Sequence, residues 1–212
     1  MNGEARQMYA LNGEYFVQLD EGEEFEIRVW NELDRRVYLG LYVDGVNSLG
    51  GQFEFPMLVP TNRHWRMDPG YGTQRRVRIP GWSVANAQTG TLEFNNFKIV
   101  TQGESVAFGQ AVDDNFGMVT AIFYTDGADP SWPGPDQAPR FKSTDQVGVG
   151  RGAADVARTS FAPGNRGIIL SAITVHYRTS AWFAALQEQP NPPDPMPVEP
   201  TPIPPDPGAD SN

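Results

Sequence analysis

The chain has 212 residues, 39% of them hydrophobic, and its 26 acidic against 16 basic side chains give a formal net charge of -10. That length fits one large β domain, and the negative charge repels nucleic-acid phosphates and anionic lipid headgroups. The absence of cysteine excludes disulfides, thiolate nucleophiles and cysteine-based metal sites. We therefore expect no nucleic-acid partner and a core stabilised by packing alone.

Residues 1–13 are expected to form an N-terminal arm. They lack the basic start and the apolar stretch of a secretion signal, and the chain has no run of 18 apolar residues that would predict a membrane helix. We therefore expect a soluble chain, made in the cytoplasm and not inserted in a membrane, which either stays there or joins a virion or an extracellular assembly.

The next residues alternate between apolar and polar with a period of two, at 14–19, 24–30 and 36–43, and predict three antiparallel strands. The third segment places its aliphatic residues on one face and Tyr38, Gly40 and Tyr42 on the other, so that its outer face is partly aromatic and open to being covered. Asp44 and Gly45 then predict a tight turn, with Asn47 hydrogen-bonded to nearby backbone. We interpret these last three residues as structural.

Further strands are predicted at 75–79, 91–100, 116–124, 155–161 and 167–179, and a short helical turn at 181–187. Prolines break the segment before residue 75 into short extended pieces, and four prolines around Trp132 predict a long loop over 126–142. From Glu188 onward there are ten prolines, five acidic residues and no basic residue, which predicts a disordered tail over 188–212.

Short strands of this kind, without internal repeats or βαβ alternation, predict an all-β fold. We expect a two-sheet antiparallel sandwich over residues 14–187 with long loops, and a distorted barrel is the alternative. Trp82 and Trp182 are expected to anchor the core or the loops.

Patterns of known catalytic chemistry are missing from the sequence. His64 and His176 are not spaced to share a metal, so we expect His64 in a loop and His176 on a strand, facing solvent or hydrogen-bonded. No Gly-x-Ser-x-Gly run is present, and the glycines of 148–152 predict a glycine-rich turn rather than a phosphate-binding loop. We therefore expect no catalytic residue, no bound cofactor and no metal ligand.

Two groups of oxygen ligands leave calcium as a minor alternative. They are Asp113-Asp114-Asn115 and the segment 126–129, and neither has the spaced acidic ladder of a calcium loop. Turn formation by side-chain hydrogen bonds to the backbone is the preferred interpretation.

Aromatic residues provide the candidate interaction surface. Trp30, Tyr38 and Tyr42 lie on predicted outer faces of neighbouring strands, and Trp132 lies in the predicted long loop. Such rings either stack against sugars or lie under a loop or a partner subunit.

Two motifs resemble an uncharacterised β-rich domain of bacterial proteins. They are the V-D-G-x-N turn within Arg36 to Asn47 and the later Ile79-Pro80-Gly81-Trp82. Segments 116–123 and 156–161 extend the likeness, so that it covers roughly residues 9–187 as one unit. The resemblance implies a fold only, because no activity, cofactor or catalytic residue is established for that group. Members of that group often occur in envelope or exported proteins. This chain differs from them, because it shows no secretion signal and has an acidic tail.

These observations favour a non-enzymatic structural or interaction protein that works within a larger assembly, such as a virion decoration or tail protein, with other protein subunits as partners. The alternative is a carbohydrate-binding, lectin-like module of a bacterial surface protein, with a glycan as its partner. An enzyme, such as a glycosidase with two carboxylates, is the third hypothesis.

Overall fold

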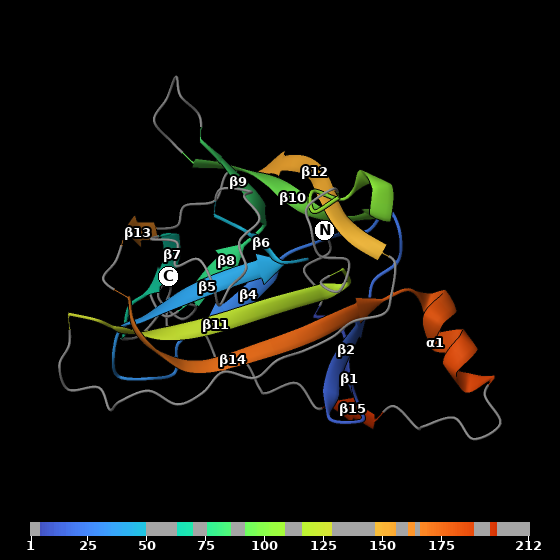
Figure 1. Ribbon diagram of the computed structural model, residues 1–212, viewed down its shortest axis with the longest axis horizontal. Coiled ribbons are helices and arrows are strands. Elements are labelled where there is room, and N and C mark those ends of the chain that lie inside the picture. Colours follow the sequence, from blue (N-terminus) through green and yellow to red (C-terminus); the bar gives the residue numbers. More distant parts are fainter. Residues whose placement is uncertain are drawn as a thin grey trace, which may run out of the picture.

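The computed structural model describes residues 5–49, 63–69, 76–85, 92–108, 116–128, 147–155, 161–163, 166–188 and 196–198. Strands dominate these ranges, which confirms the predicted all-β class (Figure 1). The described strands form three sheets, and the largest is an open path with two edges rather than a closed barrel. The described part of the chain contains no helix that is long and apolar enough to cross a membrane.

The large sheet contains nine strands. They are β1 (Met8–Leu11), β2 (Glu14–Gln18), β5 (Val37–Val43), β6 (Val46–Asn47), β7 (Arg63–Met67), β11 (Met118–Asp126), β13 (Phe161–Pro163), β14 (Arg166–Arg178) and β15 (Met196–Val198). Their order is β13-β7-β5-β11-β14-β2-β1-β15, and β6 pairs with β5. Among the described pairs β14 and β2 run parallel and the others antiparallel, because the N-terminal hairpin lies beside the last long strand.

A second sheet covers part of one face of the large sheet (Figure 1). It contains β3 (Glu24–Phe25), β9 (Gly81–Ala85), β10 (Leu92–Thr101) and β12 (Val147–Asp155). Trp65 of β7 stacks on Phe94 of β10 with ring centroids 5.8 Å apart. The ring centroids of Phe25 on β3 and Tyr177 on β14 are 6.5 Å apart. These contacts join the two sheets into one core, as expected for a sandwich.

The predicted strand over 24–30 is split between two sheets. Its first part, β3, pairs with β10, and its second part, β4 (Ile27–Trp30), pairs with β8 (Arg76–Ile79) in a two-stranded sheet. At the break, the Glu26 carboxylate accepts hydrogen bonds of 2.5 Å from both Arg28 and Arg78. A bend of this kind lets one segment serve two sheets at a corner of the sandwich.

The two motifs of the resemblance occupy close-packed backbone positions. Asp44 and Gly45 have φ values of 52° and 79°, which are those of a two-residue type I′ turn between β5 and β6. The Asn47 side chain accepts a hydrogen bond of 2.8 Å from the backbone of Leu49. At Gly81, a Cβ atom would lie 1.7 Å from the carbonyl oxygen of Asn95, so glycine is required there.

The sheet extends beyond both predicted domain boundaries. β1 lies within the expected N-terminal arm, and β15 lies within the expected tail, where it pairs with β1. The tail composition argues against a stand-alone structure, but an existing sheet edge supplies hydrogen-bond partners to an extended segment. The C-terminal helix, α1 (Ser180–Gln187), agrees with the predicted helical turn and is capped by the Thr179 side chain.

The predicted glycine-rich turn at 148–152 is wrong, because these residues lie in β12 and pair antiparallel with β10. The turn was predicted from glycine content, whereas the pairing partner is distant in sequence. The strand predicted over 155–161 overlaps β12 only at Asp155 and β13 only at Phe161, while residues 156–160 lie outside the described ranges. A short 3-10 helix, η2 (Gln102–Glu104), follows β10.

Candidate interaction surface

The core-facing side of the large sheet continues past the edge of the sheet that covers it. On β14, Tyr177 is fully buried, Val175 is half-buried and Ile173 is 46% exposed. On the parallel neighbour β2, Val17 opposite Tyr177 packs against the core, whereas Tyr15 opposite Val175 is 43% exposed. Exposure therefore rises in step along two adjacent strands.

A third strand completes this exposed area. Ala121 of β11 lies opposite Ile173 and is partly buried against the core. We call Tyr15, Ala121, Ile173 and Val175 the open strip. Its residues share the apolar character of the neighbouring core but lie partly in solvent. Large exposed apolar patches on folded domains mark contact surfaces for other proteins.

The predicted aromatic platform lies on the opposite face of the sheet and is covered. Tyr38 and Tyr42 are 5% and 1% exposed and pack with Ile122 and Tyr124 in a separate buried cluster. They alternate with the core residues of β5, as predicted, and both faces of this central strand are buried. Their ring faces are not available to a sugar in this conformation.

His64 belongs to the same covered face and not to a loop. It lies in β7 with no exposed surface, and its ring meets the Tyr124 ring edge to face at 5.0 Å. Within the part of the chain that the structure describes, neither ring nitrogen has a hydrogen-bond partner. Burial, aided by the positive charge of Arg166, lowers the pKa of His64 to about 4. The expectation of a loop residue was wrong because prolines on both sides hid a short strand.

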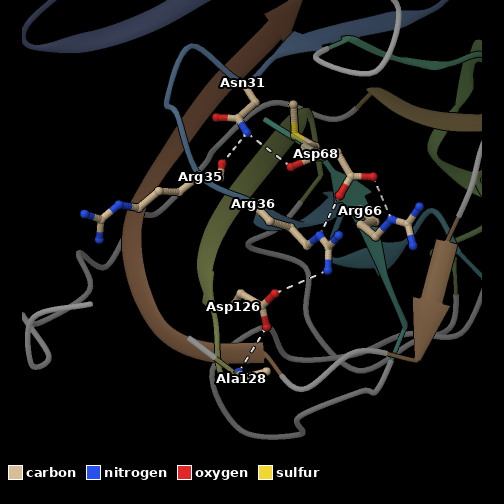
Figure 2. A network of polar contacts seen from close by, with 8 residues as sticks. Asn31, Arg35, Arg36, Arg66, Asp68, Asp126 and Ala128 are labelled. Carbon is tan, nitrogen blue, oxygen red and sulfur yellow. Dashed lines mark hydrogen bonds and ion pairs between the residues drawn. The ribbon is translucent and has the colours of Figure 1, made fainter. Parts of the chain in front are cut away.

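A network of charges ties three strand ends at the margin of this face. Figure 2 shows Arg36 between the carboxylates of Asp68 and Asp126, with nitrogen–oxygen distances of 2.5 and 3.5 Å. Arg66 forms an ion pair of 3.0 Å with the other oxygen of Asp68. Asp68 holds the pKa of Arg36 above its usual value. Because each charge faces an opposite one, the network connects the ends of β5, β7 and β11.

Asp126 also forms the side-chain hydrogen bond to the backbone that was the preferred interpretation of segment 126–129. Its Oδ1 accepts a hydrogen bond of 3.0 Å from the backbone of Ala128. Among the described residues, no three histidine or acidic side chains lie close enough to hold a metal ion together. The other proposed oxygen cluster, at 113–115, lies outside the described residues.

A buried carboxylate organises the opposite end of the strands. The Oδ1 atom of Asp44 accepts hydrogen bonds from the backbone of Gly117 and Met118, at 2.9 and 3.3 Å, and from the Tyr177 hydroxyl at 2.6 Å. Burial and the Asp44 charge raise the pKa of Tyr177 well above its usual value. These contacts hold the β5–β6 turn against β11 and β14, which is a structural role.

The second histidine is buried beneath the C-terminal helix. His176 stacks on Phe16 with ring centroids 5.1 Å apart, and Phe16 stacks on Trp182 of α1 at 5.3 Å. Burial and the charge of Arg178 lower the pKa of His176, although Glu14 opposes this shift. His176 thus lies on a strand as expected, but it is buried, and its ring contacts Phe16 of a small apolar cluster that includes Leu186 of α1.

The four residues predicted as an interaction surface do not come together. Tyr38 and Tyr42 are covered, Trp30 is half-buried on β4 of the two-stranded sheet, and Trp132 lies outside the described ranges. Sequence patterns missed the open strip because its residues alternate as core residues do. The point where a covering sheet ends is set by long-range packing, and no local pattern records it.

Comparison with known protein families, with curated proteins and with solved structures found no match to this chain. The resemblance based on the V-D-G-x-N turn and the later Gly-Trp pair therefore stays a prediction.

Proposed function

We propose that the chain is a non-enzymatic structural protein that acts through contacts with other protein subunits, within a larger assembly such as a virion. The observation that carries this proposal is the open strip, a core-type apolar face that is left partly in solvent by the covering sheet. A partner that covers Tyr15 and Ile173 removes large apolar side chains from water, which favours association.

The polar groups described above support the same proposal. The Asp44 carboxylate accepts a hydrogen bond from the Gly117 backbone, and the guanidinium groups of Arg36 and Arg178 donate to Asp68 and to the Gly117 carbonyl, so all three stabilise the fold. Such a division, with polar residues holding the scaffold and apolar residues meeting solvent, suits a subunit that binds by surface complementarity.

The carbohydrate-binding alternative is less well supported. A stacking platform requires ring faces that a sugar can reach, and Tyr38 and Tyr42 are buried. An array of glycans probed with the full chain, with and without calcium, tests this alternative directly, and specific binding would favour it over a subunit contact.

The proposed function is tested by association of the full chain, measured by light scattering over a range of concentrations. We expect concentration-dependent oligomers or incorporation into a larger particle. Ile173→Lys should weaken this association about tenfold or more, because an exposed apolar side chain that the partner covers becomes a charge. Leu33→Lys is the matched control, since Leu33 is also exposed, at 47%, but lies outside the open strip. A monomer at all concentrations and in all preparations, or equal effects of the two variants, would overturn the proposal.

A further inference from the structure

The β1 edge of the large sheet is filled by the chain's own C-terminal segment (Figure 1). β15 pairs antiparallel with β1 in a defined register, Met8↔Val198, Tyr9↔Pro197 and Ala10↔Met196. The Gln7 side-chain amide adds hydrogen bonds to the backbone oxygens of Val198, at 2.9 Å, and Met8, at 2.8 Å. The edge is therefore a site shaped for one short extended segment.

This segment is held by few contacts. β15 has three residues, of which Pro197 is exposed and Val198 is half-buried. Proline has no backbone N–H, so it cannot donate to a neighbouring strand. Release of β15 therefore breaks few hydrogen bonds, while the body of the sandwich keeps its own core.

We propose that residues 196–198 exchange between copies of this chain, so that β15 of one copy fills the β1 edge of another. The exchange rests on the proposed function, because it supplies one of the contacts that an assembly needs. A swapped strand makes the same contacts as in its own chain, so exchange carries little energetic cost. The recognition is strand addition to a sheet edge, with the register already given by β1 and β15.

The length of the connection between α1 and β15 sets the concentration at which exchange occurs. Residues 188–195 separate α1 from β15 in the sequence, and so short a connection gives the attached segment an effective concentration in about the millimolar range. In dilute solution each chain then fills its own edge. Copies packed in an assembly reach similar local concentrations, so segments from neighbouring copies compete.

The absence of native cysteine allows a direct test by cross-linking. Met8→Cys and Val198→Cys are prepared as separate full-length variants, which are mixed at about millimolar concentration and oxidised with glutathione disulfide. Directly opposed antiparallel positions have Cα atoms about 4.5–5.5 Å apart, within the range of a disulfide. We expect the mixed disulfide to exceed both homodimers several-fold.

The control pairs Val198→Cys with Glu104→Cys, because Glu104 is exposed on η2 and does not pair with β15. Mixed disulfide no more abundant than in this control would overturn the exchange. The double variant Met8→Cys/Val198→Cys, oxidised at micromolar concentration, should give an intrachain bond; if it does not, the register itself is wrong. If association depends on Ile173 but no mixed disulfide forms, the proposed function stands and only the exchange is rejected.

Discussion

The imidazole of His64 and the phenol ring of Tyr124 meet edge to face, with centroids 5.0 Å apart and planes inclined by 74°. They belong to β7 and β11, which lie on either side of β5. On β5, Gly40 stands between Tyr38 and Tyr42, and a Cβ atom there would lie 3.4 Å from Cε2 of Tyr124 and 2.9 Å from Cε2 of Tyr42. The missing side chain of Gly40 thus leaves room for the rings on this face.

Gly40→Ala should therefore destabilise the protein even though alanine is small. The added methyl group overlaps the Tyr42 ring and crowds the Tyr124 ring, and overpacking of a tight core costs about 1–3 kcal/mol. Urea denaturation of both proteins gives the difference in free energy of unfolding. Gly103→Ala is the control, because a Cβ atom there has no atom within 4 Å. Equal stability of Gly40→Ala and the wild type would mean that the rings move aside freely.

Burial of His64 predicts a loss of stability in mild acid. Its pKa falls from 6.5 in the unfolded chain to about 4 in the folded one, so the unfolded chain binds more protons between these values. Above about pH 6.5 the neutral His64 leaves the free energy of unfolding undiminished. As the pH falls toward 4, protonation of the unfolded chain lowers this free energy by about 3 kcal/mol in total.

His64→Phe tests this pH dependence, because it keeps an aromatic ring and removes the titrating group. Urea denaturation at pH 7.5 and pH 4.5 should show the wild type losing about 2–3 kcal/mol more than the variant between the two conditions. His176, whose pKa is also lowered, is present in both proteins and cancels in this comparison. Parallel losses in the two proteins would show that His64 accepts a proton without penalty.

The sequence predicts local features of this fold well. The alternation of β5, the Asp44-Gly45 turn and the position of α1 all follow from periodicity and turn chemistry over a few residues. Each is decided by atoms close together in the chain, which explains why they can be predicted without a structure.

Features that depend on distant partners could not be predicted in the same way. β12 is a strand because β10 pairs with it, β15 is a strand because β1 offers an edge, and His64 is buried although its neighbours include prolines. The open strip has the same cause, since the exposure of Ile173 depends on where the covering sheet ends. In each case tertiary packing overrides the local pattern.

The network in Figure 2 predicts a small, salt-dependent contribution of Arg36 to stability. Arg36→Met leaves the carboxylates of Asp68 and Asp126 without the guanidinium that lies between them. Because the Arg36 side chain is 41% exposed, screening by water limits the loss to about 1 kcal/mol. The difference between wild type and variant should shrink in 1 M salt, where the screening length falls to about 3 Å. A difference that is unchanged by salt would point instead to lost packing of the Arg36 stem.

The three hydrogen bonds accepted by Asp44 predict an ordered series of variants. Tyr177→Phe removes the 2.6 Å hydrogen bond from a buried carboxylate and leaves the two backbone donors, so we expect a loss of about 1–3 kcal/mol. Asp44→Ala should cost more, because it removes the acceptor of all three bonds and places alanine at a φ of 52°.

Asp44→Asn is the informative intermediate, since asparagine tolerates the left-handed conformation and keeps an acceptor oxygen. Urea denaturation should therefore rank its loss below that of Asp44→Ala. If the hydroxyl of Tyr177 acts through Asp44, adding Tyr177→Phe to Asp44→Ala should cost less than Tyr177→Phe does alone, because the partner is already gone. Strictly additive losses would show that the hydroxyl stabilises the strands by another contact, and the Asp44 carboxylate would then not be the group that joins β14 to the β5–β6 turn.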